Sequence, residues 1–131
     1  SGVIAVGVYP DGKLIFERRP EKGLLGGLWF LPGVVGPKEN PEVRAAHKDA
    51  RANAAALFGV SPEKCGVSAM ASWRFSHILL EPTIVTVHLD EYAPEAPRAS
   101  MSKERWAKEA VPTVTRHFLG SIGKEIGRAD Q

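Results

Sequence analysis

Two short runs of β-branched and apolar residues, 3–9 and 13–18, open the chain, and a Pro-Asp-Gly segment at 10–12 separates them. Proline, aspartate and glycine together favour a tight turn between antiparallel strands, so these runs predict a β-hairpin. A further apolar run at 28–31 is followed by a Pro-Gly pair at 32–33. Proline and glycine interrupt regular structure, so we expect a brief buried strand that ends there.

Apolar residues recur at intervals of three and four between Pro41 and Phe58, which is the spacing of one face of a helix. Asn40 can cap the first turn, Pro41 suits the first helical position, and Gly59 can end the helix. We therefore predict one helix over residues 41–58. Its apolar positions are Val43, Ala46, Ala50, Ala54, Leu57 and Phe58.

The second half of the chain alternates between strand-like and polar stretches. Residues 67–73 and 78–89 predict two strands that pair across a loop. Residues 93–102 predict a surface loop, 112–119 a shorter helix, and the polar residues 123–131 a frayed end. Strands, a long helix, more strands and a closing helix predict an α+β domain, in which a mixed or antiparallel β-sheet is flanked by helices in an α/β/α sandwich.

Composition narrows the possible classes of protein. A chain of 131 residues with 44% hydrophobic content suits a single domain over 1–131, and no apolar run reaches the roughly 18 residues that a membrane helix needs. The formal net charge of +2 is small for a protein that coats DNA, so a nucleic acid would have to be held by a local patch. The single cysteine, Cys65, suits the reduced thiol of a cytoplasmic protein, and a monomer is the expected state.

Two segments in the first third of the chain carry a family resemblance: Arg18-Arg19-Pro20, and Gly26-Gly27-Leu28-Trp29-Phe30-Leu31-Pro32-Gly33. They resemble the entry to the Nudix fold, in which two strands lead into a catalytic loop and helix. In that family a glutamate follows the last glycine by six positions, and the helix carries an Arg-Glu pair and an adjacent Glu-Glu pair. The helix carboxylates bind magnesium, which prefers oxygen ligands and neutralises the diphosphate that water attacks.

The predicted helix at 41–58 lacks the carboxylates that this chemistry requires. Gly33 and Glu39 keep the opening spacing of the signature. A rigid count from Gly33 then puts His47-Lys48 and Arg51-Ala52 at the two pairs, and a count anchored on Gly59-Val60 puts Ala52-Asn53 and Ala56-Leu57 there. The carboxylates of this helix are Glu42 and Asp49 alone. We therefore predict no metal site and an amphipathic helix that packs on the sheet.

Within the Nudix superfamily, the chain resembles the C-terminal domain of the MutY family of adenine DNA glycosylases. Three separated places carry this resemblance: the 18–33 region, in which Phe30 replaces the family's usual acidic residue; the tripeptide Phe75-Ser76-His77; and Trp106 with the helix that follows Val111 and Pro112. The resemblance implies a non-catalytic domain that recognises 8-oxoguanine opposite adenine in double-stranded DNA, as a step of base excision repair.

The same resemblance sets the expected partners and cofactors. Adenine excision and an iron–sulfur cluster would belong to the N-terminal catalytic domain of a bacterial, cytoplasmic and nucleoid-associated parent enzyme, and this chain would hold no cofactor. The chain begins at once in a strand-like segment, without a signal peptide before Val3. We therefore expect a C-terminal fragment of a longer protein.

The tripeptide Phe75-Ser76-His77 suits the chemistry of the lesion. Oxidation at C8 turns N7 of guanine from an acceptor into a donor and adds a carbonyl oxygen. Ser76 can accept a hydrogen bond from N7–H and donate one to that oxygen, Phe75 can wedge between bases, and His77 can bind a phosphate. Arg74 can add positive charge beside the same strand. Each residue also has an ordinary interpretation, with Phe75 as a core aromatic, Ser76 as a turn residue and His77 as a structural hydrogen bonder.

The remaining candidates point to no other clear site. The glycines at 23–27 fit no phosphate-binding motif, the tryptophans Trp29, Trp73 and Trp106 are expected to pack in or near the core, and the scattered histidines His47, His88 and His117 predict no zinc site. Two alternatives stay open. One is a hydrolase of nucleoside diphosphate derivatives that uses carboxylates outside the helix, such as Glu39 with Glu81 or Glu91. The other is a module that binds a protein or a nucleotide without reading DNA.

Overall fold

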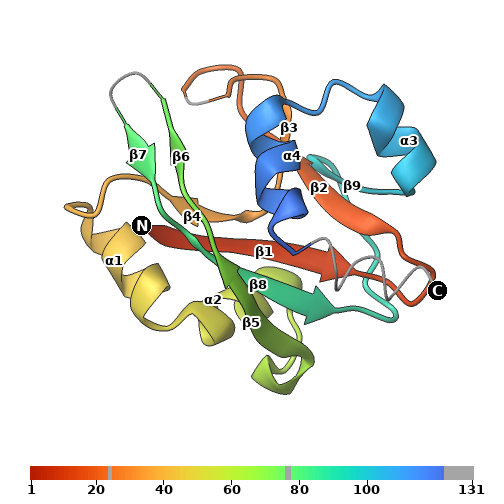
Figure 1. Cartoon of the computed structure of the whole chain (residues 1–131). Helices are drawn as coiled ribbons and strands as arrows, with labels where there is room; N and C mark the ends of the chain where they lie inside the picture. The colour runs from red at the N-terminus through yellow and green to blue at the C-terminus, as the bar shows by residue number, and fades with distance from the viewer. Residues whose placement is uncertain (24, 76–77, 123–131) are drawn as a thin grey trace.

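A mixed β-sheet with helices on both faces organises the chain in a computed structural model, which describes residues 1–23, 25–75 and 78–122 (Figure 1). The strands are β1 (Gly2–Val8), β2 (Leu14–Arg18), β3 (Trp29–Phe30), β4 (Gly33–Val35), β5 (Cys65–Met70), β6 (Trp73–Arg74), β7 (Leu79–Leu80), β8 (Thr83–His88) and β9 (Arg98–Met101). The helices are α1 (Pro41–Lys48), α2 (Ala50–Phe58), the short 3-10 helix η1 (Pro62–Lys64), α3 (Lys103–Lys108) and α4 (Thr113–Gly120).

Strand β1 lies at the centre of the main sheet, whose order is β3-β2-β1-β8-β5. It pairs in parallel with β8 and antiparallel with β2 and β4, while β5 pairs antiparallel with β8 at the edge of the sheet. The predicted first hairpin is confirmed, because Gly12 N donates to Tyr9 O at 2.9 Å and closes the turn between β1 and β2. The predicted pairing of the two later strand regions is also confirmed, as the β5–β8 pair and the separate β6–β7 pair.

Residues 41–58 form two helices, α1 and α2. The prediction of one continuous helix over this range was therefore wrong. Asn40 caps α1 by accepting from the backbone N–H of Glu42 and Val43, with Pro41 in the first turn, and Gly59 ends α2 in the left-handed conformation, as predicted. The helix breaks at Asp49, whose φ of −123° and ψ of 59° are not helical. The bend lets both helices lay their apolar faces on the twisted sheet, because each of them contacts β1.

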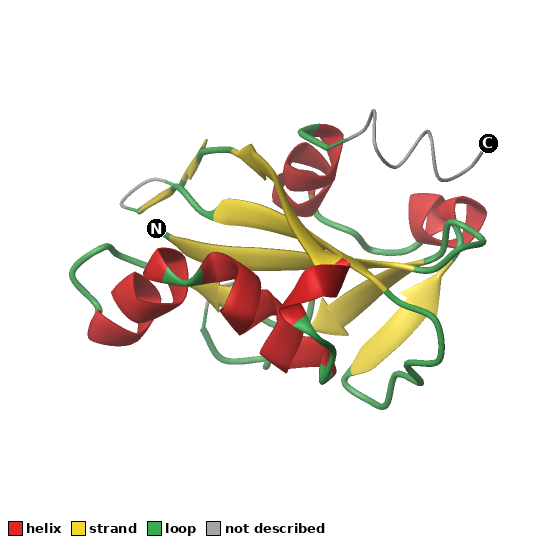
Figure 2. Cartoon of the chain, turned by 90° about the horizontal axis from the view of Figure 1, so that it is seen from below, coloured by secondary structure: helices red, strands yellow, loops and turns green. Residues whose placement is uncertain are grey.

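The sheet separates two cores, and Figure 2 shows helices on both of its sides. Alternate residues of β1 point to opposite faces, so that Val3 and Ala5 face α1 and α2, whereas Ile4 and Val6 face α4. On the α4 side the rings of Phe30 and Phe118 stack with their centroids 6.2 Å apart. These two layers of helix on one sheet confirm the predicted α/β/α sandwich.

Two strands lie where the sequence predicted an end or a loop. The Pro-Gly pair was expected to end the strand at 28–31. Strand β4 begins at its glycine, Gly33, and pairs with β1 through Gly33 and Ile4. A Cβ on Gly33 would lie 2.2 Å from the carbonyl oxygen of Val3, so only glycine allows this close pairing. Strand β9 lies inside the predicted loop at 93–102 and pairs with β2 from Leu14↔Met101 to Glu17↔Arg98.

Long-range polar contacts of one arginine explain why β9 forms. Arg98 Nε lies 2.9 Å from Glu17 Oε1, and its Nη1 donates to the carbonyl of Leu57 and the hydroxyl of Tyr92. The side chain is largely buried, and burial alone would lower its pKa, but the hydrogen bonds to Glu17 and Tyr92 outweigh burial and raise the pKa of Arg98. The guanidinium therefore stays charged and ties β9 to β2 and α2.

The last third of the chain carries α3, which the sequence did not predict, and α4, which it did. Pro112 precedes α4 as its N-cap residue. The tail at 123–131, predicted to fray, lies outside the described residues. Within residues 1–23, 25–75 and 78–122, no helix has the length and apolar content needed to cross a membrane.

Candidate functional site

The two-stranded β6–β7 hairpin carries the residues that the sequence singled out. Trp73 pairs with Leu80 and Arg74 with Leu79, and the backbone N–H of Phe75 donates to Ile78 O at 2.8 Å. Figure 1 shows this hairpin extending from the ends of β5 and β8, away from the body of the main sheet. Ser76 and His77 lie outside the described residues. The structure therefore places Arg74 and Phe75 at the outer end of the hairpin, directly before these two positions in the chain.

Arg74 and Phe75 differ in how much of each side chain meets solvent. Arg74 is exposed, and within the described residues it makes no ion pair. Phe75 is half-buried and packs against the core on the α4 side of the sheet. The ordinary interpretation of Phe75 as a packing residue is thus supported, although the residue is not fully buried.

Helix α4 holds the base of the hairpin through His117, for which no local sequence pattern indicated a structural role. His117 Nε2 lies 2.9 Å from the carbonyl oxygen of Ser72, and its ring lies 5.1 Å from the ring of Trp73. The two bonded residues are 45 positions apart, so no local pattern could have revealed the contact. All three tryptophans are half-buried, which confirms their predicted packing role.

The junction of α1 and α2 carries the residues that the rigid count from Gly33 puts at the carboxylate positions of the Nudix signature. Residues at all four positions of the rigid count, His47, Lys48, Arg51 and Ala52, line one hollow of about 410 Å³. Asp49 is the single carboxylate among the residues that line it. Across the described part of the chain, no three side chains of histidine, cysteine, aspartate or glutamate gather as they would around a metal ion. The donor set at this junction therefore does not fit magnesium.

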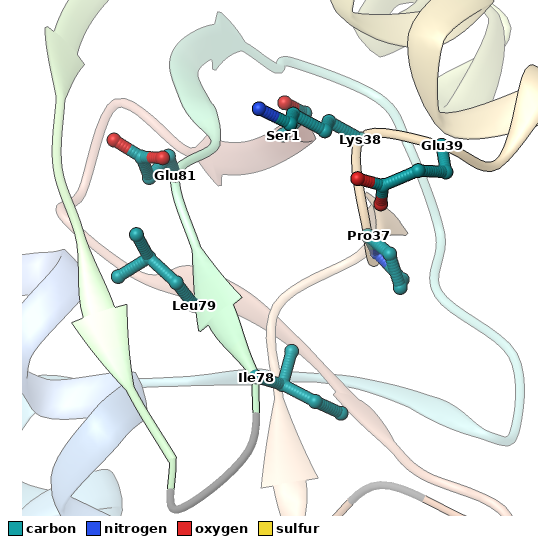
Figure 3. Close-up of a pocket in the computed structure, with 7 residues that line it drawn as sticks. All are labelled: Ser1, Pro37, Lys38, Glu39, Ile78, Leu79 and Glu81. Carbon is teal, nitrogen blue, oxygen red and sulfur yellow. The ribbon is translucent and has the colours of Figure 1, made fainter.

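A second pocket, of about 250 Å³, lies between the loop that precedes α1 and strand β7 (Figure 3). Glu39 lines it from the loop, and Glu81 lines it from the other side, just after β7. Two of the carboxylates that the sequence offered for a divergent hydrolase site thus share one pocket. Glu91 does not, because it lines a separate hollow with His88 and Lys64.

Similar solved structures are found among proteins of different activities. One is the C-terminal domain of mouse MUTYH in its complex with human PCNA, which is 19% identical at a TM-score of 0.71, with 95% of this chain and 87% of that chain covered. Another is the NUDIX domain of NrtR from Shewanella oneidensis, complexed with ADP ribose, at 12% identity and a TM-score of 0.68, covering 95% of this chain and 86% of that one. A third is the Nudix hydrolase RenU from M. smegmatis, at 15% identity and a TM-score of 0.54, covering 97% and 84%.

These similarities show the fold, because their sequence identities are low. No curated protein sequence matches the chain. The sequence profile of the NUDIX domain matches residues 3–121, which is nearly the whole of the described chain. By that match the chain belongs to the NUDIX domain family.

Proposed function

We propose that this chain is a non-catalytic domain that recognises 8-oxoguanine opposite adenine in double-stranded DNA. The observation that carries the proposal is the β6–β7 hairpin, which puts exposed Arg74 and half-exposed Phe75 beside Ser76 and His77 in the chain. A helix pair without a carboxylate cluster supports the same interpretation, since the family's hydrolytic chemistry depends on such a cluster.

Each residue of the hairpin has a distinct role in this proposal. Ser76 accepts a hydrogen bond from N7–H of the lesion, a donor that undamaged guanine does not have. Phe75 stacks on or wedges between bases, while Arg74 and His77 meet the phosphates of the same strand. The net charge of +2 supports few phosphate contacts, so binding by this domain is weak and falls steeply with salt.

The proposal assigns adenine excision to a separate N-terminal catalytic domain of a longer, cytoplasmic parent enzyme, together with any iron–sulfur cluster. In this proposal the present domain is a monomer, and it gives the parent enzyme its preference for DNA that contains the lesion. The hairpin is suited to such a role, because a short projecting element on a rigid sheet can reach a groove without disturbing the core.

The test is a binding measurement with the 131-residue chain. Chemical shifts of the ¹⁵N-labelled protein are followed at low salt as it is titrated with duplexes that differ only in one pair, 8-oxoguanine:adenine or guanine:adenine. We expect about tenfold tighter binding to the lesion duplex, the effect of one or two hydrogen bonds to a base. Ser76→Ala should remove most of this preference, and Phe75→Ala should weaken binding to both duplexes.

Ser72→Ala is the matched control, since Ser72 is an exposed serine at the base of the same hairpin and contacts His117 only through its backbone carbonyl. It should leave the preference unchanged. Equal affinity of the unaltered chain for the two duplexes, or an unchanged preference in Ser76→Ala, would defeat the proposal.

A second candidate function is hydrolysis of a nucleoside diphosphate derivative. One observation favours it, namely that Glu39 and Glu81 line the same pocket and have no ion-pair partner among the described residues. The measurement is magnesium-dependent turnover of a panel of nucleotides by the chain. Turnover that Glu39→Gln and Glu81→Gln each abolish, and that Glu91→Gln leaves intact, would establish this function in place of the first.

A further inference from the structure

The hollow at the α1–α2 junction brings together cations from one helical bend and a hydroxyl from the sheet. Lys48 and Arg51 stand on either side of the break at Asp49, and Thr83 lines the same hollow from the start of β8. The break gives α2 a free beginning, where Asp49 makes no side-chain capping bond. The backbone N–H groups at a helix start carry a partial positive charge, so the bend adds to the charge of the two cations.

The charge of Arg51 is held in place and is not neutralised. Its Nε donates to the carbonyl of Cys65 at 3.2 Å and its Nη2 to the carbonyl of Pro62 at 2.8 Å. Both partners are neutral, and in the described structure neither Arg51 nor Lys48 pairs with a carboxylate. Two permanent cations thus face one carboxylate, that of Asp49, across the hollow. His47 lies beside them, oriented by its Nδ1, which is 3.0 Å from the carbonyl oxygen of Gly2.

Thr83 adds a hydroxyl to the hollow from a largely buried position on the sheet. Its side chain is only 8% exposed, yet its hydroxyl has no hydrogen-bond partner among the described residues. The oxygen is not among the fully buried polar atoms without a partner, which in the described residues are Trp29 Nε1 and Asn53 Oδ1, so solvent reaches it. Because Thr83 lines the hollow, a ligand seated there can accept the hydrogen bond that the protein leaves unmade.

From these features we infer that the hollow binds a phosphate group directly, without a divalent cation. A phosphate has several charged oxygens, which suit two cationic side chains, a helix start and a hydroxyl donor that approach from different elements. On the rigid count from Gly33, the site occupies the positions at which the Nudix signature places its magnesium carboxylates, with basic side chains in their place. Phosphates can come from the DNA backbone or from a free nucleotide, and both offer the same oxygens to this site.

The experiment titrates the ¹⁵N-labelled 131-residue chain, in the presence of EDTA, with inorganic pyrophosphate and separately with an undamaged DNA duplex. The amide signals of Lys48, Arg51 and Thr83 should shift and saturate with pyrophosphate. Thr83→Val, which keeps the shape of the side chain and removes the hydroxyl, should weaken pyrophosphate binding by about tenfold. Lys48→Glu should weaken it further, whereas Lys103→Glu, at an exposed lysine of α3 away from the hollow, should not.

The two probes distinguish the source of the phosphate. If the duplex shifts the same signals, and added pyrophosphate moves them to their positions in the pyrophosphate complex, the source is the DNA backbone. If pyrophosphate shifts these signals and the duplex does not, the source is a free phosphate or nucleotide. Shifts with neither probe, a requirement for magnesium, or equal losses in Lys48→Glu and Lys103→Glu would overturn the inference. If Thr83→Val fails to fold, the comparison of the two exposed lysines still decides the outcome.

This inference does not depend on the lesion-reading hairpin. Phe75→Ala should leave pyrophosphate affinity unchanged, because Phe75 does not line the hollow. A domain that fails to discriminate 8-oxoguanine can therefore still bind phosphate here, and a domain without the phosphate site can still read the lesion.

Discussion

The central strands and the β6–β7 hairpin differ in almost every property that determines stability. All seven residues of β1 are buried, and helices cover both faces of the strand. The strands of the hairpin have two residues each, and of these only Leu80 is fully buried. Local opening of such an element costs much less free energy than unfolding the sheet. The sheet thus supplies the stability of the domain, and the hairpin is free to carry a binding function.

The strongest test of this difference between sheet and hairpin uses two neighbouring residues of α4. One packs in the core of the sheet, and the other contacts the hairpin. Phe118 is fully buried and stacks on Phe30, whereas His117 is exposed and contacts the hairpin. Phe118→Ala should lower the free energy of unfolding by about 3–5 kcal/mol, the usual cost of removing a buried phenyl ring. Urea denaturation followed by circular dichroism measures the change. A loss below about 1 kcal/mol would mean that α4 does not stabilise the sheet as its packing indicates.

Features with a local cause were predictable from the sequence, and features that depend on distant partners were not. Gly12 in the first turn, Asn40 at the start of α1 and Gly59 at the end of α2 all act within a few residues of themselves. The break at Asp49 lies between two helices that both contact β1, a strand far away in the sequence. Strand β9 depends on Arg98 meeting Glu17, Leu57 and Tyr92, and its prolines made the segment look like a loop.

The candidate site follows the same rule. The sequence identified Arg74 and Phe75 as part of a loop between strands, and the structure puts them on a hairpin. It left two counts of the Nudix signature open, and the residues of the rigid count, His47, Lys48, Arg51 and Ala52, all line one hollow. Thr83 and His117 had no sequence signal, because their importance comes from what lies beside them in space.

A smaller effect should separate the hairpin from the sheet without unfolding either. His117→Ala removes the hydrogen bond to the carbonyl of Ser72 and should cost about 1 kcal/mol, felt mainly by the hairpin. Hydrogen exchange of the Phe75 amide, which bonds Ile78 in the native hairpin, should then quicken by about fivefold. The amide of Val6 in β1 should exchange at its original rate.

His88→Ala provides the matched control for this measurement, since His88 is an exposed histidine of β8 that lies away from the hairpin and α4. It should change neither exchange rate. Equal acceleration at Phe75 and Val6 in His117→Ala would show that the hairpin opens only with the whole domain, and the division between the two regions would be lost.

The smallest expected effect concerns the edge strand β5, which either belongs to the rigid sheet or opens locally like the hairpin. The reactivity of Cys65 distinguishes these two alternatives. Cys65 is buried at the start of β5, and burial raises the pKa of its thiol, although the positive charge of Arg51 opposes the shift. A raised pKa in the folded state stabilises the fold at pH values below the ordinary thiol pKa, and this contribution is lost as the pH rises through the folded value.

If β5 is part of the rigid sheet, iodoacetamide at pH 8 should alkylate the native thiol at least about tenfold more slowly than the thiol in urea. Stability should also fall slightly at alkaline pH relative to Cys65→Ala, which has no thiol to ionise. Native alkylation as fast as in urea would place β5 with the hairpin, because only local opening could expose the sulfur so readily.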